Sequence, residues 1–304
     1  MTALILNTIY FEDGGIERMD NNSHTIIGKI SYTNSWPVFH NFHPSALKYP
    51  AEMVSEVPAI LNQGMSRGTI HVGALSSFAY AEASDKLLLL PDLSVSADGP
   101  VRSIFLFSRV PFAQIGSGKI AVTNTSATSV NLLKILMEKA FGNKPEYISA
   151  NPDLDDMMHE ADACLLIGDN AIKASWQDQG YIVTDLAEVW KKWTGLGMTF
   201  AVWAVNRKAA EDKPEAISEI AEAFAESKMR GLRDLDPIVQ AACSNIGGTK
   251  SYWEGYFRNL CYDFGERQQQ GLNLYFRYAY EMGLLPQEVK MEIWSHKLLT
   301  RVKE

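Results

Sequence analysis

Short apolar runs alternate with helical patterns from Ile26 to about residue 206. Several of these runs have the length and β-branched content of buried strands: IIGKISY, TIHVGAL, KIAVTNT, ADACLLIG and MTFAVWAVNR. In the segments between them, apolar residues recur every three to four positions, as in SATSVNLLKILMEKAFG. Strands that alternate with helices in this way predict an α/β fold with parallel sheets.

The strand and helix order starts twice, once at Ile26 and again after Gly116. Long extended segments near 101–112 and 198–206 separate the two units, and the remainder of the chain is almost wholly helical in pattern. We interpret this as two lobes with a helical C-terminus: a discontinuous first lobe over 26–110 and 205–304, and a second lobe over 111–204. Two consecutive domains are the alternative, but no Pro/Gly/Ser-rich or charged linker marks a boundary between them.

Residues 1–25 contain few apolar positions, which is typical of a disordered leader or an over-long start assignment. The short apolar stretch there has no preceding basic region, so no export signal is indicated. No apolar run approaches the roughly 18 to 20 residues that cross a bilayer. We therefore expect a cytoplasmic protein with no membrane partner.

Composition narrows the class further. The 304 residues are 46% hydrophobic, enough for two modest cores, and the formal charge of −8 comes with no Lys/Arg-rich run. Nucleic acid is thus excluded as an expected partner. The cysteines Cys164, Cys243 and Cys261 lie far apart, which fits neither a disulfide framework nor a zinc site and indicates a reducing compartment.

Two Ser/Thr clusters are the most informative local features. Ser76 and Ser77 follow one predicted strand and residues 125–129, TSATS, follow another, so both clusters fall where a helix starts. Helix starts bind anions through free backbone N–H groups and hydroxyls. If the lobes face each other, the two starts converge on one small molecule that carries carboxylates. The alternative is that each cluster only caps its own helix.

Other motifs fail on inspection. IGSGKIA lacks the first glycine and the final Ser/Thr of a phosphate loop. His40 and His43 have no carboxylate or cysteine nearby in sequence, and NPDLDDMMHE lacks the later Gly and Glu of a calcium loop and is typical of a helix start. The stripe Tyr252, Trp253, Tyr256 and Phe257 has helical spacing and is interpreted as core. We expect no metal site.

Several segments between residues 26 and 205 carry distinctive motifs, namely GKISYTNSWPVF, GTIHVGALSSFAYA, LLLLPDLSVSADGPVRSIFLFSR, TNTSATSVNLL, ADACLLIGDNA and DLAEVWKKWTGLGMTFAVWA. Together these segments resemble a known family, the chorismate dehydratases of the futalosine route to menaquinone. The chain departs from the family in its 25-residue leader and at Gly197-Met198, where relatives tend to have Pro-Phe. The resemblance implies a periplasmic-binding-protein type II-like fold, which agrees with the two-lobed interpretation.

The resemblance implies a hydro-lyase that converts chorismate to 3-[(1-carboxyvinyl)oxy]benzoate plus water in menaquinone biosynthesis. Loss of the C3 proton and the C4 hydroxyl aromatises the ring, so no cofactor is expected. It also implies site residues. Asn34 is the catalytic or orienting side chain, with the substrate's enolpyruvyl carboxylate as hypothetical base. The remaining candidates are substrate binders, namely Ser76, Ser77, Ser103, Thr125, Ser126, Thr128, Ser129 and Asp169.

Some alternatives stay open. Asp169 is equally well interpreted as an N-cap of the helix AIKASW. Arg102 is either a bidentate donor to a substrate carboxylate or part of a surface ion pair, and the second interpretation is favoured because strand alternation points Arg102 away from Ser103. A dihydroxynaphthoate synthase of the same pathway would need a histidine base, for which His40, His43 and His159 are the candidates. A non-catalytic solute-binding protein would share the fold. Neither the sequence nor the resemblance gives an expectation for the oligomeric state.

Overall fold

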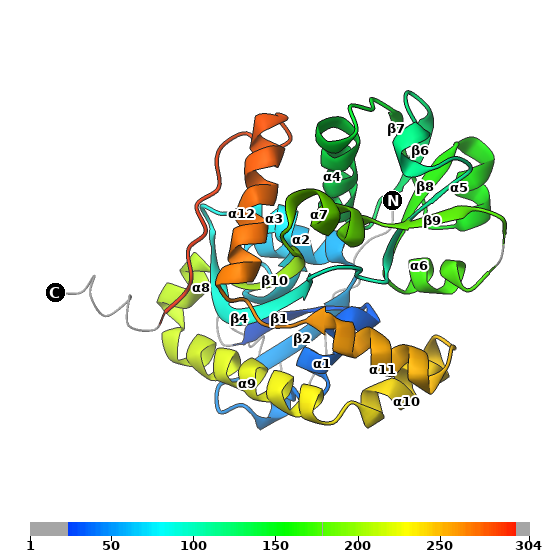
Figure 1. The fold of residues 1–304 in the computed structure, drawn as a ribbon. Helices are drawn as coiled ribbons and strands as arrows, with labels where there is room; N and C mark the ends of the chain where they lie inside the picture. Colours follow the sequence, from blue (N-terminus) through cyan, green and yellow to red (C-terminus); the bar gives the residue numbers. More distant parts are fainter. Residues whose placement is uncertain (1–23, 178, 296–304) are drawn as a thin grey trace, which may run out of the picture.

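The computed structural model describes residues 24–177 and 179–295. The described chain forms two β-sheets that lie side by side and are covered by helices (Figure 1). The α/β class predicted from the alternating pattern is thereby confirmed. The expected leader falls outside the described residues except for its last two positions, and buried Thr25 is already the first residue of β1.

The first sheet has six strands in the order β11-β4-β10-β3-β1-β2. Its strands are β1 (Thr25–Ile30), β2 (Ala51–Glu56), β3 (Val72–Ser76), β4 (Leu87–Ala97), β10 (Met198–Asn206) and β11 (Leu260–Cys261). Strand β1 pairs in parallel with β2 and β3, whereas β10 runs antiparallel to both β3 and β4.

The second sheet has five strands in the order β7-β6-β8-β5-β9. They are β5 (Ile104–Ser108), β6 (Lys119–Thr123), β7 (Glu146–Ala150), β8 (Ala163–Ile167) and β9 (Ile182–Asp185). Strand β6 is parallel to β7 and β8, and β5 is antiparallel to β8 and β9. In each sheet, the first strand that the chain forms after crossing, β5 or β10, runs antiparallel to its neighbours, because the chain enters from the opposite end.

The chain crosses between the sheets at residues 98–103 and again at 195–197. The sequence places the lobe boundaries at 110/111 and 204/205, which assigns β5 to the first lobe and most of β10 to the second. We propose the two crossings as the boundaries instead. An apolar strand pattern marks β5 and β10 as buried but carries no information on which sheet they join. Phe107 and residues 201–203 accordingly lie inside the sheets, in β5 and β10.

Twelve α-helices occur among the described residues. The shorter ones are α1 (Trp36–Phe39), α2 (Pro58–Arg67), α3 (Ser77–Glu82), α4 (Ala127–Ile135), α5 (Leu154–Glu160), α6 (Gly168–Ser175), α7 (Leu186–Thr194) and α8 (Arg207–Asp212). The C-terminal ones are α9 (Pro214–Arg233), α10 (Asp236–Asn245), α11 (Lys250–Asn259) and α12 (Glu266–Glu281). A 3-10 turn, η1 (Thr33–Ser35), follows β1, and a π-helical turn, η4 (Leu136–Ala140), extends α4. Two further 3-10 turns are η2 (Pro44–Ala46) and η3 (Phe112–Gln114).

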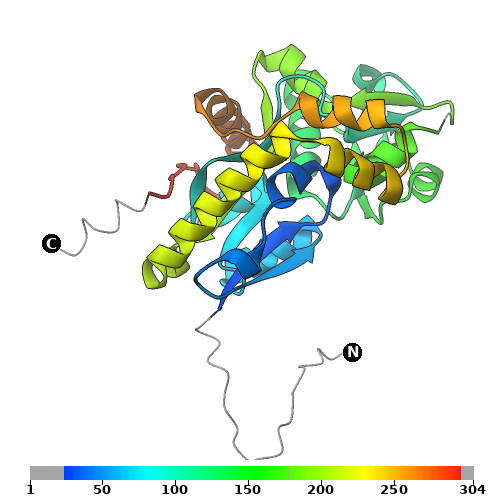
Figure 2. The ribbon, with the colours of Figure 1, turned by 90° about the horizontal axis from the view of Figure 1, so that it is seen from below.

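The helical C-terminus packs back on the first sheet, as predicted. Helix α9 lies along that sheet beside α1, and α10 and α11 continue toward the second lobe (Figure 2). On this face, Trp203 of β10 packs with Phe39 and Phe224, at ring-centroid distances of 5.6 and 6.3 Å. Lys228 of α9 ties the helix to the sheet through ion pairs of 2.8 Å to both Asp92 and Asp263.

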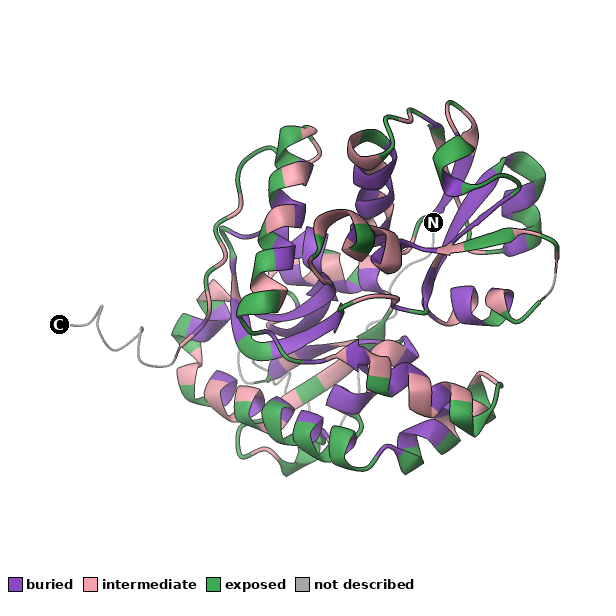
Figure 3. Ribbon diagram, viewed as in Figure 1, coloured by how far each residue is buried: buried purple, intermediate pink, exposed green. Residues whose placement is uncertain are grey.

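The larger hydrophobic core reaches across both sheets. Figure 3 shows that the central strands are buried, whereas the edge strands β2, β7 and β9 and the outer faces of the helices are more exposed. Tyr275 of α12 packs against Phe78 of α3 and against Trp190 of α7, so a helix after the second crossing joins the two lobes. The composition is sufficient for two modest cores, and the structure has one large core and a smaller separate cluster around Phe107 and Cys164 in the second sheet. The large core reaches across both sheets because α12 packs between α3 and α7 as well as on the sheet.

A pair of helical glycines tests the close packing of α1 against α9. A Cβ on Gly231 of α9 would lie 2.2 Å from the carbonyl oxygen of Pro37, whereas one on Gly255 of α11 would meet its nearest neighbour at 3.5 Å. Ala normally stabilises a helix interior relative to Gly by about 0.5 to 1 kcal/mol. We therefore expect Gly255→Ala to raise the free energy of unfolding by that amount and Gly231→Ala to lower it, measured by urea denaturation. Equal effects of the two variants would contradict the packing.

Candidate functional site

The two predicted helix starts meet where the lobes join. Helix α3 starts directly after β3 and α4 starts shortly after β6, so both helices begin at the carboxyl end of a strand. The backbone N–H of Phe78, in the first turn of α3, donates to the Thr128 Oγ1 in the first turn of α4 at 2.9 Å. Ser77 and Thr128 are fully or almost fully buried. The sequence predicted that the clusters converge, and the structure brings them into direct contact.

Ser76 and Ser126 are the N-caps of these two helices. Ser76 Oγ accepts from the backbone N–H of Ala79 at 3.3 Å and from Asn62 Nδ2 at 3.1 Å. Ser126 Oγ accepts from the N–H of Ser129 at 3.3 Å. Both serines therefore have the capping role that the sequence left open, and each satisfies one backbone donor of its own helix.

The hydroxyl groups in the two clusters differ in whether their protons are available to bond a ligand. Ser77 donates its proton to the carbonyl oxygen of Thr199 at 2.9 Å, and Ser126 donates to Ser129 Oγ at 3.1 Å. Ser76, Thr128 and Ser129 accept hydrogen bonds through their hydroxyls, but within the described residues none of these hydroxyls donates one. Each of these buried hydroxyls therefore keeps a proton that an anion at the helix starts can accept.

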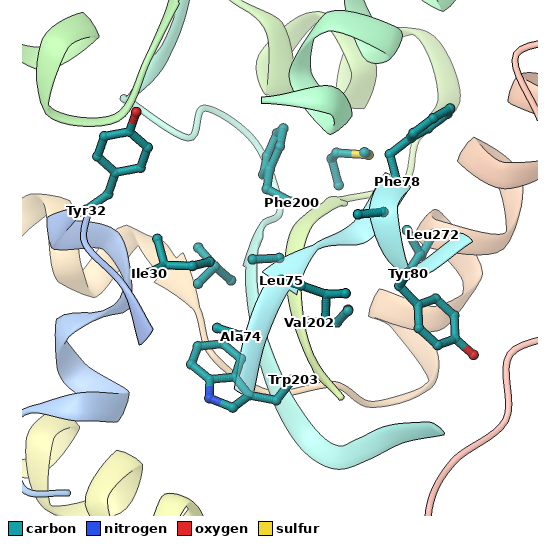
Figure 4. Close-up of a cluster of buried hydrophobic side chains, with 14 of the residues drawn as sticks. Ile30, Tyr32, Ala74, Leu75, Phe78, Tyr80, Phe200, Val202, Trp203 and Leu272 are labelled. Atoms are coloured by element: carbon teal, nitrogen blue, oxygen red, sulfur yellow. The ribbon is translucent and has the colours of Figure 1, made fainter. Parts of the chain in front are cut away.

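Tyr32 crosses from the first lobe to the second beside these helix starts. Its hydroxyl donates to Thr125 Oγ1 at 3.2 Å, and its ring lies so close to Gly168 that a Cβ there would be 3.0 Å from the ring carbons. Figure 4 shows Tyr32, Phe78 and Phe200 pointing away from the first sheet toward the second lobe. Gly168 has φ +58°, so it also meets a backbone requirement that other residues rarely tolerate.

Asn34 lies in the η1 turn, which a third contact between the lobes holds. The Asp169 carboxylate accepts from the Thr33 hydroxyl at 2.5 Å and from the Thr33 backbone N–H at 3.3 Å. Asp169 lies in the first turn of α6 but does not cap it, so its interpretation as an N-cap is wrong. The half-buried Asn34 side chain has a buried Oδ1 that makes no hydrogen bond within the described residues.

Ser103 sits at the end of the first crossing, in a segment held by a buried carboxylate. Asp185 accepts the backbone N–H groups of Val101 at 3.2 Å and Arg102 at 2.7 Å, and those of Ala187 and Glu188 at the start of α7. Ser103 is buried and Arg102 exposed, as predicted, but strand alternation is not the cause. Arg102 has φ +58° and lies outside the strand.

Tyr256 of α11 joins this group, which the sequence did not predict. Its fully buried hydroxyl lies beside the Ser103 and Thr33 hydroxyls yet makes no hydrogen bond of standard geometry within the described chain. Burial strongly raises the pKa of Tyr256, so the hydroxyl stays protonated. The aromatic stripe belongs to the core, as expected. Its apolar pattern gave no signal that the Tyr256 hydroxyl lies among the polar groups of the site.

Burial also raises the pKa of the Asp169 carboxyl above its usual range. The two hydrogen bonds from Thr33 and the charge of Lys173 oppose that shift, because they stabilise the ionised form. Tyr32 shows the same pattern: burial raises its pKa, and its hydrogen bond to Thr125 works in the opposite direction.

The described histidines that could serve as bases lie elsewhere. His71 Nδ1 accepts the backbone N–H of Ile26 at 2.9 Å at the start of β3. His40 and His43 border surface pockets beside α9, and His159 is on the exposed side of α5. Among the described residues, no group of three or more His, Cys, Asp or Glu side chains is arranged to hold a metal ion.

Comparison with solved structures defines the class of the fold. The chain superimposes on a protein of Archaeoglobus fulgidus with a TM-score of 0.71 at 20% identity, covering 86% of this chain and 99% of that one. It superimposes on the periplasmic aliphatic sulphonate binding protein of Escherichia coli with a TM-score of 0.65 at 16% identity, covering 90% and 92%. A Candida albicans protein described as having the generic periplasmic binding protein fold gives a TM-score of 0.63 at 10% identity, covering 92% and 94%. The predicted periplasmic-binding-protein-like fold is confirmed.

Sequence comparison then gives the family. The family model described as menaquinone biosynthesis matches residues 25–281, and the chain belongs to that family. The chorismate dehydratase of Thermus thermophilus is 30% identical over 265 residues, which cover 82% of this chain and 93% of that enzyme. The resemblance noted from the sequence is confirmed at the level of the family. None of the helices in residues 24–177 and 179–295 combines the length and the hydrophobicity of a transmembrane segment.

Two aspartate N-caps test how strongly the first crossing is held. Asp185 is buried and accepts four backbone N–H groups, whereas Asp153 is exposed and accepts one, from Asp156 at 3.0 Å. Asp185→Ala leaves buried donors unpaired, each of which costs about 1 to 3 kcal/mol. We expect Asp185→Ala to destabilise by at least about 3 kcal/mol and Asp153→Ala by about 1 kcal/mol in urea denaturation. Similar losses in the two variants would contradict this account.

Proposed function

We propose that this protein is a chorismate dehydratase that forms 3-[(1-carboxyvinyl)oxy]benzoate and water. The observation that carries the proposal is the similarity to the Thermus thermophilus chorismate dehydratase, which extends over 93% of that enzyme. Membership of the menaquinone biosynthesis family agrees with it. The buried polar groups at the junction of the lobes are of the kind that a small dicarboxylate requires.

The chemistry explains why helix starts suit this substrate. Chorismate loses the C3 proton and the C4 hydroxyl, and charge develops toward the ring carboxylate as the C3–H bond breaks. Backbone N–H groups and hydroxyls around that carboxylate stabilise the developing charge. The free hydroxyl protons of Thr128 and Ser129 are the strongest candidates for this contact, and the buried α3 start faces them. Thr125, Ser126, Ser76 and Ser77 complete the surroundings by holding the helix starts in place.

Asn34 aligns the ring in this proposal, and the substrate supplies the base. The buried Oδ1 of Asn34 has no hydrogen-bond partner in the described chain, so it is available to a hydroxyl of the substrate. The nearby carboxylate of Asp169 is already engaged with Thr33. The enolpyruvyl carboxylate of chorismate takes the C3 proton and passes it to the C4 hydroxyl, which leaves as water. Ser103 is buried at the end of the first crossing and is a further candidate for substrate contact.

The two alternatives have less support. A dihydroxynaphthoate synthase would need a histidine base, but His71 is bonded to the backbone of Ile26, and His40, His43 and His159 lie at surface pockets. A non-catalytic solute-binding role is compatible with the fold, which this chain shares with solute-binding proteins of low sequence identity. A shared fold alone does not assign a function. The cytoplasmic location, the absence of a nucleic-acid partner and the absence of a cofactor stay predictions.

Turnover of chorismate tests the proposed function directly. Purified protein incubated with chorismate should yield an aromatic enolpyruvyl ether, followed by ultraviolet absorbance and mass spectrometry. Because aromatisation drives the dehydration, we expect the rate to be unchanged after EDTA treatment and desalting. Activity that is lost with EDTA and returns only with a metal ion would contradict the proposed chemistry.

Three variants separate alignment from binding. Asn34→Ala should lower kcat about a hundredfold with a small change in KM, because misalignment acts at the barrier. Ser129→Ala should chiefly raise KM, since one hydrogen bond to a charged group contributes roughly 1.5 to 3 kcal/mol. Ser84→Ala is the control: its buried hydroxyl donates only to the carbonyl of Ala81 and should leave both constants unchanged. A raised KM with normal kcat in Asn34→Ala would make Asn34 a binding residue.

A further inference from the structure

The turn that carries Asn34 is held from both lobes. On one side of Asn34, Ser35 donates its hydroxyl proton to the carbonyl oxygens of Ile30 at 2.9 Å and Tyr32 at 3.1 Å, within the first lobe. On the other side, Thr33 makes two hydrogen bonds to Asp169 of the second lobe. The backbone on either side of Asn34 is therefore anchored, and one of the anchors exists only when the two lobes are together.

Because Thr33 is buried, it strongly favours the arrangement in which it is bonded to Asp169. Thr33 is fully buried, and Asp169 belongs to α6, which begins with Gly168 against the Tyr32 ring. A buried hydroxyl or N–H that loses its acceptor costs about 1 to 3 kcal/mol. Thr33 therefore prefers the arrangement in which both of its donors reach Asp169 Oδ1, and that arrangement fixes the position of the next residue in the chain.

We propose that Asp169 is a positioning residue that sets the orientation of Asn34 through Thr33 when the lobes meet. The inference rests on the proposed dehydratase function and deepens it. Asp169 does not touch the substrate in this account and transfers no proton. It makes the alignment of the substrate depend on contact between the lobes, because Asn34 comes from the first lobe and its anchor from the second.

Tyr256 is the second support of the same turn. Its hydroxyl lies beside the Thr33 and Ser103 hydroxyls, and its ring is held in the core by Trp253 and Phe257 at 5.4 Å each. A rigid ring at this place limits how far Thr33 can move away from Asp169. Tyr256 thus contributes to position through packing, whereas Asp169 contributes through hydrogen bonds.

Replacing Asp169 by Asn and by Ala distinguishes a positioning role from an acid, base or substrate-binding role. Asp169→Asn keeps an Oδ1 that accepts from both Thr33 donors, so kcat should stay within about fivefold of wild type. Asp169→Ala removes the acceptor and should lower kcat by about ten- to a hundredfold while KM changes little. Equal loss of kcat in both variants would mean that Asp169 is an acid or base, and a raised KM in both would make it a binding residue. Either result overturns the proposal.

A double-mutant cycle shows whether Asp169 acts through Asn34. If it does, Asn34→Ala combined with Asp169→Ala should be no slower than Asn34→Ala alone. Multiplied losses in the double variant would contradict the proposal. Thr33→Val and Thr33→Ser form a matched pair, since only the serine keeps the hydroxyl donor, and only the valine variant should lose kcat. Asp153→Ala, an exposed N-cap far from the turn, is the control for nonspecific destabilisation.

Amide hydrogen exchange gives a readout that does not depend on turnover. The Thr33 N–H should exchange faster in Asp169→Ala than in wild type or Asp169→Asn, while the amides of α9 exchange equally in all three. If wild-type protein does not convert chorismate, the proposed function fails, and exchange at Thr33 still decides whether Asp169 holds the turn. Unchanged exchange in Asp169→Ala would overturn the positioning role even if the enzyme is active.

Discussion

The buried carboxylate of Asp185 is the constraint on which the arrangement of the two lobes depends. It accepts two backbone N–H groups from the first crossing and two from the start of α7. A single side chain therefore links the first crossing to the helix that directly precedes the second crossing. The second crossing lies close by: a Cβ on Gly197 would be 2.8 Å from the carbonyl oxygen of Ala97, and one on Gly271 of α12 would be 2.1 Å from the carbonyl oxygen of Gly197. The second crossing therefore packs closely against the end of β4 and against α12 at Gly197, and Lys191 links the two crossings through Asp98 at 2.5 Å and the carbonyl oxygen of Gly195 at 2.9 Å.

This arrangement gives each lobe a different share of the proposed site. The first lobe provides Asn34 and the start of α3, and the second provides the start of α4 and the acceptor on α6. Three polar contacts join these parts, from Phe78 to Thr128, from Tyr32 to Thr125 and from Thr33 to Asp169. Each contact has a donor on one lobe and an acceptor on the other. Thr128 and Thr125 are themselves candidates for substrate contact, and Thr33 is directly next to Asn34. Alignment and binding are thus both linked to the same interface.

The sequence predicted the parts of the structure that depend on local pattern. Alternating strands and helices indicated the α/β class, the Ser/Thr clusters marked the starts of α3 and α4, and the absence of a linker favoured two crossings over two domains. It could not show which sheet β5 and β10 join, because a buried strand has the same apolar pattern in either sheet. It left Asp169 open as an N-cap and identified Tyr256 only as core, because it could not show that Asp169 bonds to Thr33 or that the Tyr256 hydroxyl lies beside Ser103, residues far away in the chain. Contacts between distant residues leave no periodic signal.

Substrate binding at the proposed site must exchange contacts within the protein for contacts with the ligand. The Phe78 N–H and the Thr128 hydroxyl already satisfy each other across the lobes, so a carboxylate at the α3 start competes with a neutral oxygen for the same donor. A charged acceptor wins that competition, because a hydrogen bond to a carboxylate is roughly twice as strong as one between neutral groups. In the proposed mechanism, Thr128 turns its free proton to the same carboxylate, while its own carbonyl is held by the Tyr275 hydroxyl at 3.1 Å. The proposal thus has the helix starts change partners while α12 keeps them in place, and Thr33 and Asp169 fix the turn that carries Asn34.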